Sequence, residues 1–156
     1  MDDNNQGRIG PIDGRGLHRL DTPLDAHGAQ VLQRIVAKRD ISYTEAVRRA
    51  IGIRAAIAEF DSEGAQATLI SGDGTRTALL APTVTPDLPA GVPLSVNLNT
   101  ETAEALVHLH LPGGDSFAEV IRQGAVVYER VWETQEGGGQ VSITRDGAAV
   151  RTLVLM

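Results

Sequence analysis

The chain has 156 residues, of which 42% are hydrophobic, contains no cysteine and carries a formal net charge of −6. The lack of cysteine excludes a disulfide framework and a thiolate metal site. No run approaches the roughly 20 consecutive apolar residues of a membrane helix, and the polar start does not resemble a signal peptide. We therefore expect a cytoplasmic protein that makes no contact with a membrane.

The sequence repeats itself with a period of 74 residues. Leu24–Gln66 aligns without a gap with Leu98–Gln140, and nine of the paired residues are identical, where ordinary composition gives roughly three by chance. A self-match at a fixed period indicates a duplicated structural unit. We predict a disordered arm over residues 1–16, a first repeat over 17–80, a linker over 81–91 and a second repeat over 92–156.

Each repeat is expected to begin with a short strand and a helix. Leu17–Leu24 and Pro93–Leu98 alternate apolar and polar residues, which is typical of a strand with one buried face. Asp25 and Asn99 follow these strands, and both residue types are strong helix N-caps. The apolar residues after each cap recur at close to helical spacing, so a first helix follows each strand.

A second helix starts at Ser42 and again at Ser116, each followed three residues later by a glutamate. This spacing predicts a capping box, in which the serine accepts from a backbone N–H and the glutamate returns to the serine N–H. We expect helices over residues 43–62 and 117–135, because glycines follow at both ends.

A β-hairpin is expected to close each repeat. The first joins Ala67–Ile70 to Arg76–Leu80, and the second joins Val141–Thr144 to Ala149–Leu155. Glycine with aspartate between short alternating segments favours such a turn. The sequence therefore predicts an α+β fold with two units of strand, helix, helix and hairpin.

The first strand of each unit has no partner within its own unit, although its backbone groups need hydrogen bonds. We predict that the two first strands pair as an antiparallel ribbon across a pseudo-twofold axis, which makes the chain an intramolecular dimer. The eleven-residue linker permits the same pairing between two chains, so self-association stays open.

A short strand, a helix, a turn and a second helix that opens with Ser-x-x-Glu resemble the ribbon-helix-helix family of Arc- and MetJ-like repressors. The resemblance covers Arg19–Phe60 and Leu94–Thr134. It implies a small transcription regulator that inserts its ribbon into the major groove of double-stranded DNA. By position, the outward ribbon residues would contact bases and the second-helix starts would contact phosphates; these are Arg19, Asp21, Ser95 and Asn97 for bases, and Ser42, Tyr43, Thr44 and Ser116 for phosphates.

The charge distribution favours an alternative function. The first repeat has as many basic as acidic residues, eight of each, whereas the second has four basic and eight acidic residues. An acidic repeat opposes the electrostatic attraction that dominates DNA affinity. The alternative is a protein-interaction module, antitoxin-like or an adaptor, that keeps the fold without binding DNA. Tyr128 and Trp132 are its candidate partner contacts, because aromatic residues dominate binding hot spots; core filling is the competing interpretation.

We expect no catalytic residue, cofactor or metal. His108 and His110 are two positions apart, so they point to different sides of a helix and do not form a ligand pair. The glycine runs lack the lysine and hydroxyl residue of a phosphate-binding loop. Neither Ser42 nor Ser116 has a neighbouring base, so the chain is predicted not to be an enzyme.

Overall fold

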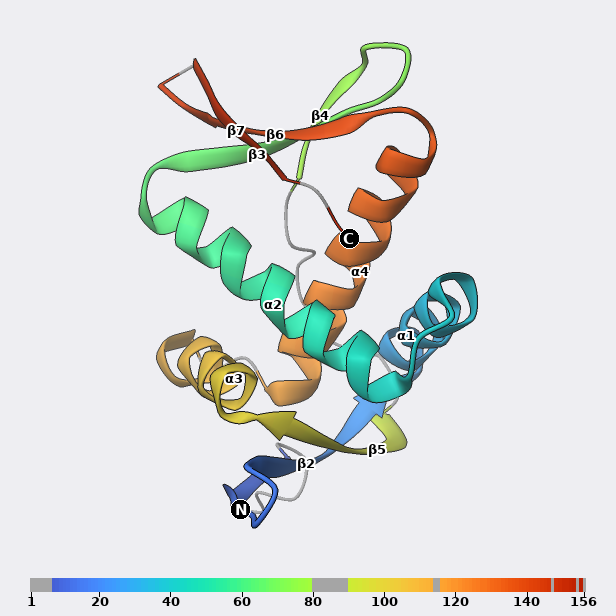
Figure 1. The fold of residues 1–156 in the computed structure, drawn as a ribbon, viewed down its shortest axis with the longest axis vertical. Coiled ribbons are helices and arrows are strands. Elements are labelled where there is room, and N and C mark those ends of the chain that lie inside the picture. The colour runs from blue at the N-terminus through green and yellow to red at the C-terminus, as the bar shows by residue number, and fades with distance from the viewer. Residues whose placement is uncertain (1–6, 80–89, 114–115, 147, 154, 156) are drawn as a thin grey trace.

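The computed structural model describes residues 7–79, 90–113, 116–146, 148–153 and 155. Over these residues the chain has an α+β fold with four helices and two antiparallel sheets. Figure 1 shows the sheets at opposite ends of the molecule, with the helices between them. The predicted linker lies mostly outside the described residues, and its last two residues belong to the strand that begins at Ala90.

The first sheet contains the two strands that were expected to pair. Strand β2 (Leu17–Asp25) lies antiparallel to β5 (Ala90–Asn99) within the one chain. The alternation is as predicted, because Leu20 and Leu24 of β2 and Val96 and Leu98 of β5 are buried against the helices. The opposite face of both strands points away from the helices.

A third strand, β1 (Arg8–Ile12), pairs antiparallel with the other edge of β2. The prediction of a disordered arm is therefore wrong for this segment, while residues 1–6 lie outside the described residues. The connecting turn is held by Asp13, whose carboxylate accepts from the backbone N–H groups of Arg15 and Leu17 at 2.7 and 3.1 Å. The pairing satisfies backbone groups at an edge of β2 that a two-stranded ribbon would leave open.

The four helices begin where the capping residues predicted. Helix α1 spans Ala26–Arg39, α2 spans Tyr43–Ser62, α3 spans Thr100–Gly113 and α4 spans Phe117–Glu136. The side chains of Ser42 and Ser116 each accept from the N–H group three residues on. The return bonds of the two capping boxes are replaced, since the glutamate side chains form ion pairs with arginines on their own helices.

The two predicted hairpins form, and they join into one sheet. Strands β3 (Ala65–Ile70) and β4 (Arg76–Ala78) make the first hairpin, and β6 (Gln140–Arg145) and β7 (Ala148–Leu153) make the second. Strands β3 and β6 pair antiparallel, which gives the order β4-β3-β6-β7. This junction was not predicted. It satisfies two strand edges that separate hairpins would expose.

Residues 74 positions apart face each other at three levels of the molecule. Asp21 pairs with Ser95 in the first sheet, and Thr68 pairs with Ser142 in the second. Between the sheets, α2 packs across α4, where a Cβ atom on Gly124 would overlap the carbonyl oxygen of Ala50. Each of these pairs joins the two copies of one repeat position.

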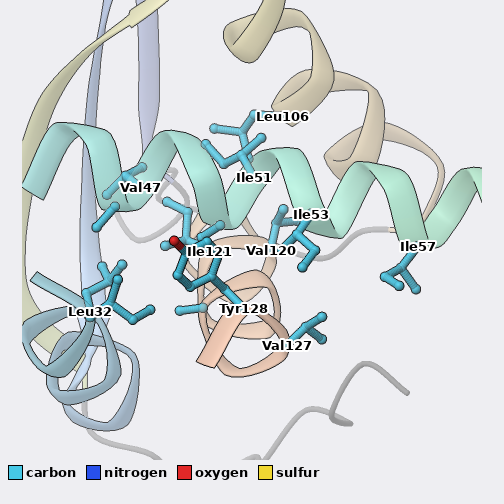
Figure 2. Packing of buried hydrophobic residues seen from close by; sticks show 14 of the residues in the cluster. Leu32, Val47, Ile51, Ile53, Ile57, Leu106, Val120, Ile121, Val127 and Tyr128 are labelled. Carbon is cyan, nitrogen blue, oxygen red and sulfur yellow. The ribbon is translucent and has the colours of Figure 1, made fainter. Parts of the chain in front are cut away.

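The core lies along this helix crossing. Figure 2 shows Ile51 of α2 next to Leu106 of α3 on one side of α2, and Ile121 of α4 on the opposite side; Val47 of α2 and Leu32 of α1 lie nearby. All five side chains are fully buried. One apolar cluster therefore unites both repeats, as expected for units too small to bury sufficient cores alone.

The helix crossing predicts the effect of a single methyl group. Gly124→Ala forces the methyl group against the Ala50 backbone, so we expect a loss of about 1–3 kcal/mol in the free energy of unfolding. Gly52 provides the matched control, because a Cβ atom there meets nothing within 4 Å. Gly52→Ala should raise stability by about 0.5–1 kcal/mol through helix propensity. Urea denaturation followed by circular dichroism measures both, and equal effects would contradict the proposed contact.

Candidate interaction surface

The outward face of the first sheet brings together the four predicted base-contacting residues. Arg19 lies opposite Asn97, and Asp21 lies opposite Ser95. The Arg19 Nε atom donates to both carboxylate oxygens of Asp21 at 3.0 and 3.1 Å, and the Ser95 hydroxyl donates to Asp21 Oδ1 at 2.7 Å. Three of the four side chains are therefore bonded to one another across the centre of the sheet.

These contacts keep Asp21 ionised. The hydrogen bond from Ser95 lowers the pKa of this carboxyl group most, and the hydrogen bond and charge of Arg19 lower it further. At neutral pH the middle of the face is thus a carboxylate whose hydrogen-bonding partners lie within the protein. Because Arg19 is paired with this carboxylate at 3.0 Å, its guanidinium is less available to a phosphate or a base.

Strand β1 changes the shape of the surface as well as its charge. Arg8 of β1 lies opposite Asp21, so the exposed sheet has three strands at this level. The major groove of DNA is about 12 Å wide, and it admits a two-stranded ribbon. Each further strand widens a sheet by about 4.8 Å. The observed sheet is therefore broader than the ribbon that the resemblance implied.

The predicted phosphate contacts at the two helix starts differ in accessibility. Ser42, Tyr43 and Thr44 at the start of α2 are exposed. Ser116 at the start of α4 is half-buried, and the next residue, Phe117, is buried. Both serine hydroxyls already cap their own helices. Of the two helix starts, the one in α2 is open to a partner.

An arginine that is identical in both repeats also differs in its exposure to solvent. Arg122 of α4 is 2% exposed and forms ion pairs with Glu119 at 2.5 Å and Asp25 at 3.7 Å. Its equivalent, Arg48 of α2, is 45% exposed and pairs with Glu45. Sequence reasoning missed this buried cluster, although the identity of the arginine in both repeats was its signal.

The two predicted partner contacts are placed differently from the expectation. Tyr128 is 2% exposed, and its hydroxyl oxygen accepts from Arg49 at 2.9 Å. Core filling is therefore the correct interpretation of this residue, and an exposed partner contact is wrong. Tyr128 lies on the face of α4 that meets α2 (Figure 2). Trp132 is half-buried beneath α1, with the cationic groups of Lys38 and Arg39 at 5.6 and 5.7 Å from its ring. These cation–π contacts give Trp132 a structural role within the fold, which needs no partner protein.

An open groove of about 510 Å³ lies between β5, α1 and the start of α2. The described part of the chain exposes three large hydrophobic residues, and two of them line this groove. These are Tyr43 and Val92, each 44% exposed. Sequence reasoning did not find this groove, since it forms where three separate elements meet. Its lining consists of Leu24, Ala29, Leu32, Gln33, Ser42, Tyr43, Thr44 and residues 92–96.

Over the described residues, no group of three histidine or acidic side chains is arranged to hold a metal ion. Within the same residues, each helix is too short or too polar to cross a membrane.

Comparison with protein-family models, with curated proteins and with solved structures found no match for the chain. The functional argument therefore depends on the surface itself.

The pKa of Asp21 tests the description of the sheet face. Ser95→Ala should raise this pKa toward its ordinary value, because the mutation removes the largest cause of the shift. Asn97→Ala is the matched control on the same strand and should leave the pKa in place. A carboxyl-carbon NMR titration measures both. Since the folded-state pKa is lowered, the stabilising contribution is present above the unfolded pKa and disappears as pH falls through the folded value.

The buried arginine gives a second test. Arg122→Ala leaves the carboxylates of Glu119 and Asp25 without their buried cation, so we expect a loss of about 3–5 kcal/mol in stability. Arg48→Ala removes the equivalent exposed ion pair and should cost at most about 1 kcal/mol. Chemical denaturation at neutral pH compares the two variants. Similar losses would mean that the cluster at Arg122 is not buried in solution.

Proposed function

We propose that the chain is a protein-interaction module built from two ribbon-helix-helix units, folded as an intramolecular pseudo-dimer. The support for the fold is the set of facing residues 74 positions apart. The pairs Asp21–Ser95, Ala50–Gly124 and Thr68–Ser142 support a pseudo-twofold axis through both sheets and the helix crossing. Each pair is the self-contact that a duplicated unit makes across such an axis. A cytoplasmic location belongs to the same proposal.

The observation on which the interaction function depends is the apolar groove beside the open edge of β5. Tyr43 and Val92 expose apolar surface there, next to a strand edge and a helix start. An exposed hydrophobic patch beside polar backbone groups is characteristic of protein contact sites. On the other side of the sheet, β1 pairs with the equivalent edge of β2.

DNA binding is the second candidate function. It is favoured by the antiparallel β2–β5 pair, which presents Arg19 and Asn97 on its outer face. Against it are the pairing of Arg19 with the ionised Asp21, the third strand and the net charge of −6. Since phosphate contacts supply most of the affinity of DNA-binding proteins, we place protein interaction first.

Fluorescence anisotropy with duplex DNA from upstream of the protein's own gene separates the two functions. We expect no complex that survives at about 0.15 M salt, the physiological value. Binding that persists at this salt concentration and weakens at least tenfold in Arg19→Ala would overturn the proposal. Thr75→Ala, at the far sheet, is the control for unspecific effects of mutation. We also expect that a partner protein binds this chain with a fixed stoichiometry in the absence of DNA.

A further inference from the structure

The two central strands of the proposed pseudo-dimer have equivalent outer edges, and within the described residues a third strand pairs with one of them. Residues 18–22 of β2 occupy the same repeat positions as residues 92–96 of β5. Strand β1 pairs with the first of these segments. The second segment lines the open groove, and no strand pairs with its outer edge among the described residues.

The surroundings of the two edges are closely related. Five residues that line the groove have an identical residue at the equivalent place beside β1, and Tyr43 corresponds to Phe117. Phe117 is 8% exposed and lies against the ring of His110, at 4.5 Å between the ring centroids, whereas Tyr43 is 44% exposed. The residues around the open groove thus repeat those around the edge of β2, which β1 occupies. The identical pairs are Leu20/Leu94, Leu24/Leu98, Ala29/Ala103, Leu32/Leu106 and Ser42/Ser116.

Strand β1 shows the chemistry that fits such an edge. Ile9 lies opposite Leu20 and packs against the core. Gly7 approaches Thr22 so closely that an added Cβ atom would lie 2.6 Å from the threonine Cβ. A fitting strand thus places a branched aliphatic side chain inward and a very small residue two positions before it.

The backbone of β5 can accept such a strand over part of its length. Pro23 lies opposite Pro93, and neither residue has an N–H group, so this pair is not hydrogen-bonded. Antiparallel ladders alternate bonded and non-bonded pairs. The N–H groups of Ser95 and Asn97 therefore point to the outer edge, whereas Pro93 offers only its carbonyl. Pairing is therefore expected at Ser95, because its equivalent in β2, Asp21, is paired with Arg8 of β1.

We propose that the open edge of β5 binds an extended segment of a partner protein, which adds to the sheet antiparallel to β5. The segment places a branched aliphatic residue opposite Leu94 and a glycine near Val96, as Ile9 and Gly7 are placed on β2. This inference depends on the proposed interaction function and specifies the class of partner. The backbone bonds supply affinity, and the groove selects the inward side chain.

A peptide with the sequence Gly7–Ile12, labelled with fluorescein, probes this edge of the full chain by anisotropy. The tethered β1 occupies the edge of β2 at an effective concentration in the millimolar range. The added peptide is therefore expected to bind at the edge of β5. We expect saturable binding that weakens at least tenfold in Val92→Lys. A peptide with Ile9→Asp should lose affinity to the same extent. Hydrogen exchange should slow at the amide of Ser95 when the native peptide binds.

Ile12→Lys is the matched control, because Ile12 is the third exposed large hydrophobic residue and does not line the groove. Its affinity for the peptide should stay within twofold of the native chain. Absence of binding up to millimolar peptide, or equal binding by Val92→Lys, would overturn the inference. So would a concentration-dependent dimer that Val92→Lys dissociates, since a second copy would then occupy the edge. A protein partner that binds regardless of Val92 would overturn this inference and leave the proposed function standing.

Discussion

The close approach of α2 and α4 is the constraint on which the rest of the structure depends. At Gly124 the two helices approach so closely that no side chain fits against Ala50. This contact allows the long helices of both repeats to share one apolar cluster, which neither repeat could assemble alone. The sheets at the two ends of the helices then bring the strands of both repeats into register. The chain consequently folds as one unit although its sequence is repeated.

Divergence between the repeats has made the two halves unequal around this common centre. In the second half, Arg122 is buried between Glu119 and Asp25, and Trp132 lies beneath Lys38 and Arg39 of α1. The equivalent residues in the first half are an exposed arginine, Arg48, and a small residue, Ala58. Burial of a charged residue requires partners on a neighbouring element, and α1 supplies Asp25 at its cap only to the second half.

The first sheet shows the functional consequence of this inequality. Strand β1 covers the edge of β2, while the matching edge of β5 is left beside an apolar groove. A symmetric homodimer would carry two identical edges, both open or both covered. A duplicated chain can cover one edge with its own segment and keep the other for a partner. Arg19 and Ser95 on the outer face are hydrogen-bonded to Asp21, which favours the edge over the outer face as the site of the proposed interaction.

Local chemistry in the sequence was sufficient for the elements and for the repeat. The Ser42 and Ser116 caps, the alternating strands and the aspartate–glycine turns act within a few residues, so they predicted the helices, the two hairpins and the pairing of β2 with β5. Only the tertiary structure decided the docking of β1, the joining of β3 to β6, the burial of Tyr128 and the groove beside Val92. These features depend on which surfaces remain open once the helices have packed. Elements that are distant in the sequence determine which surfaces stay open, so a pattern of neighbouring residues does not predict them.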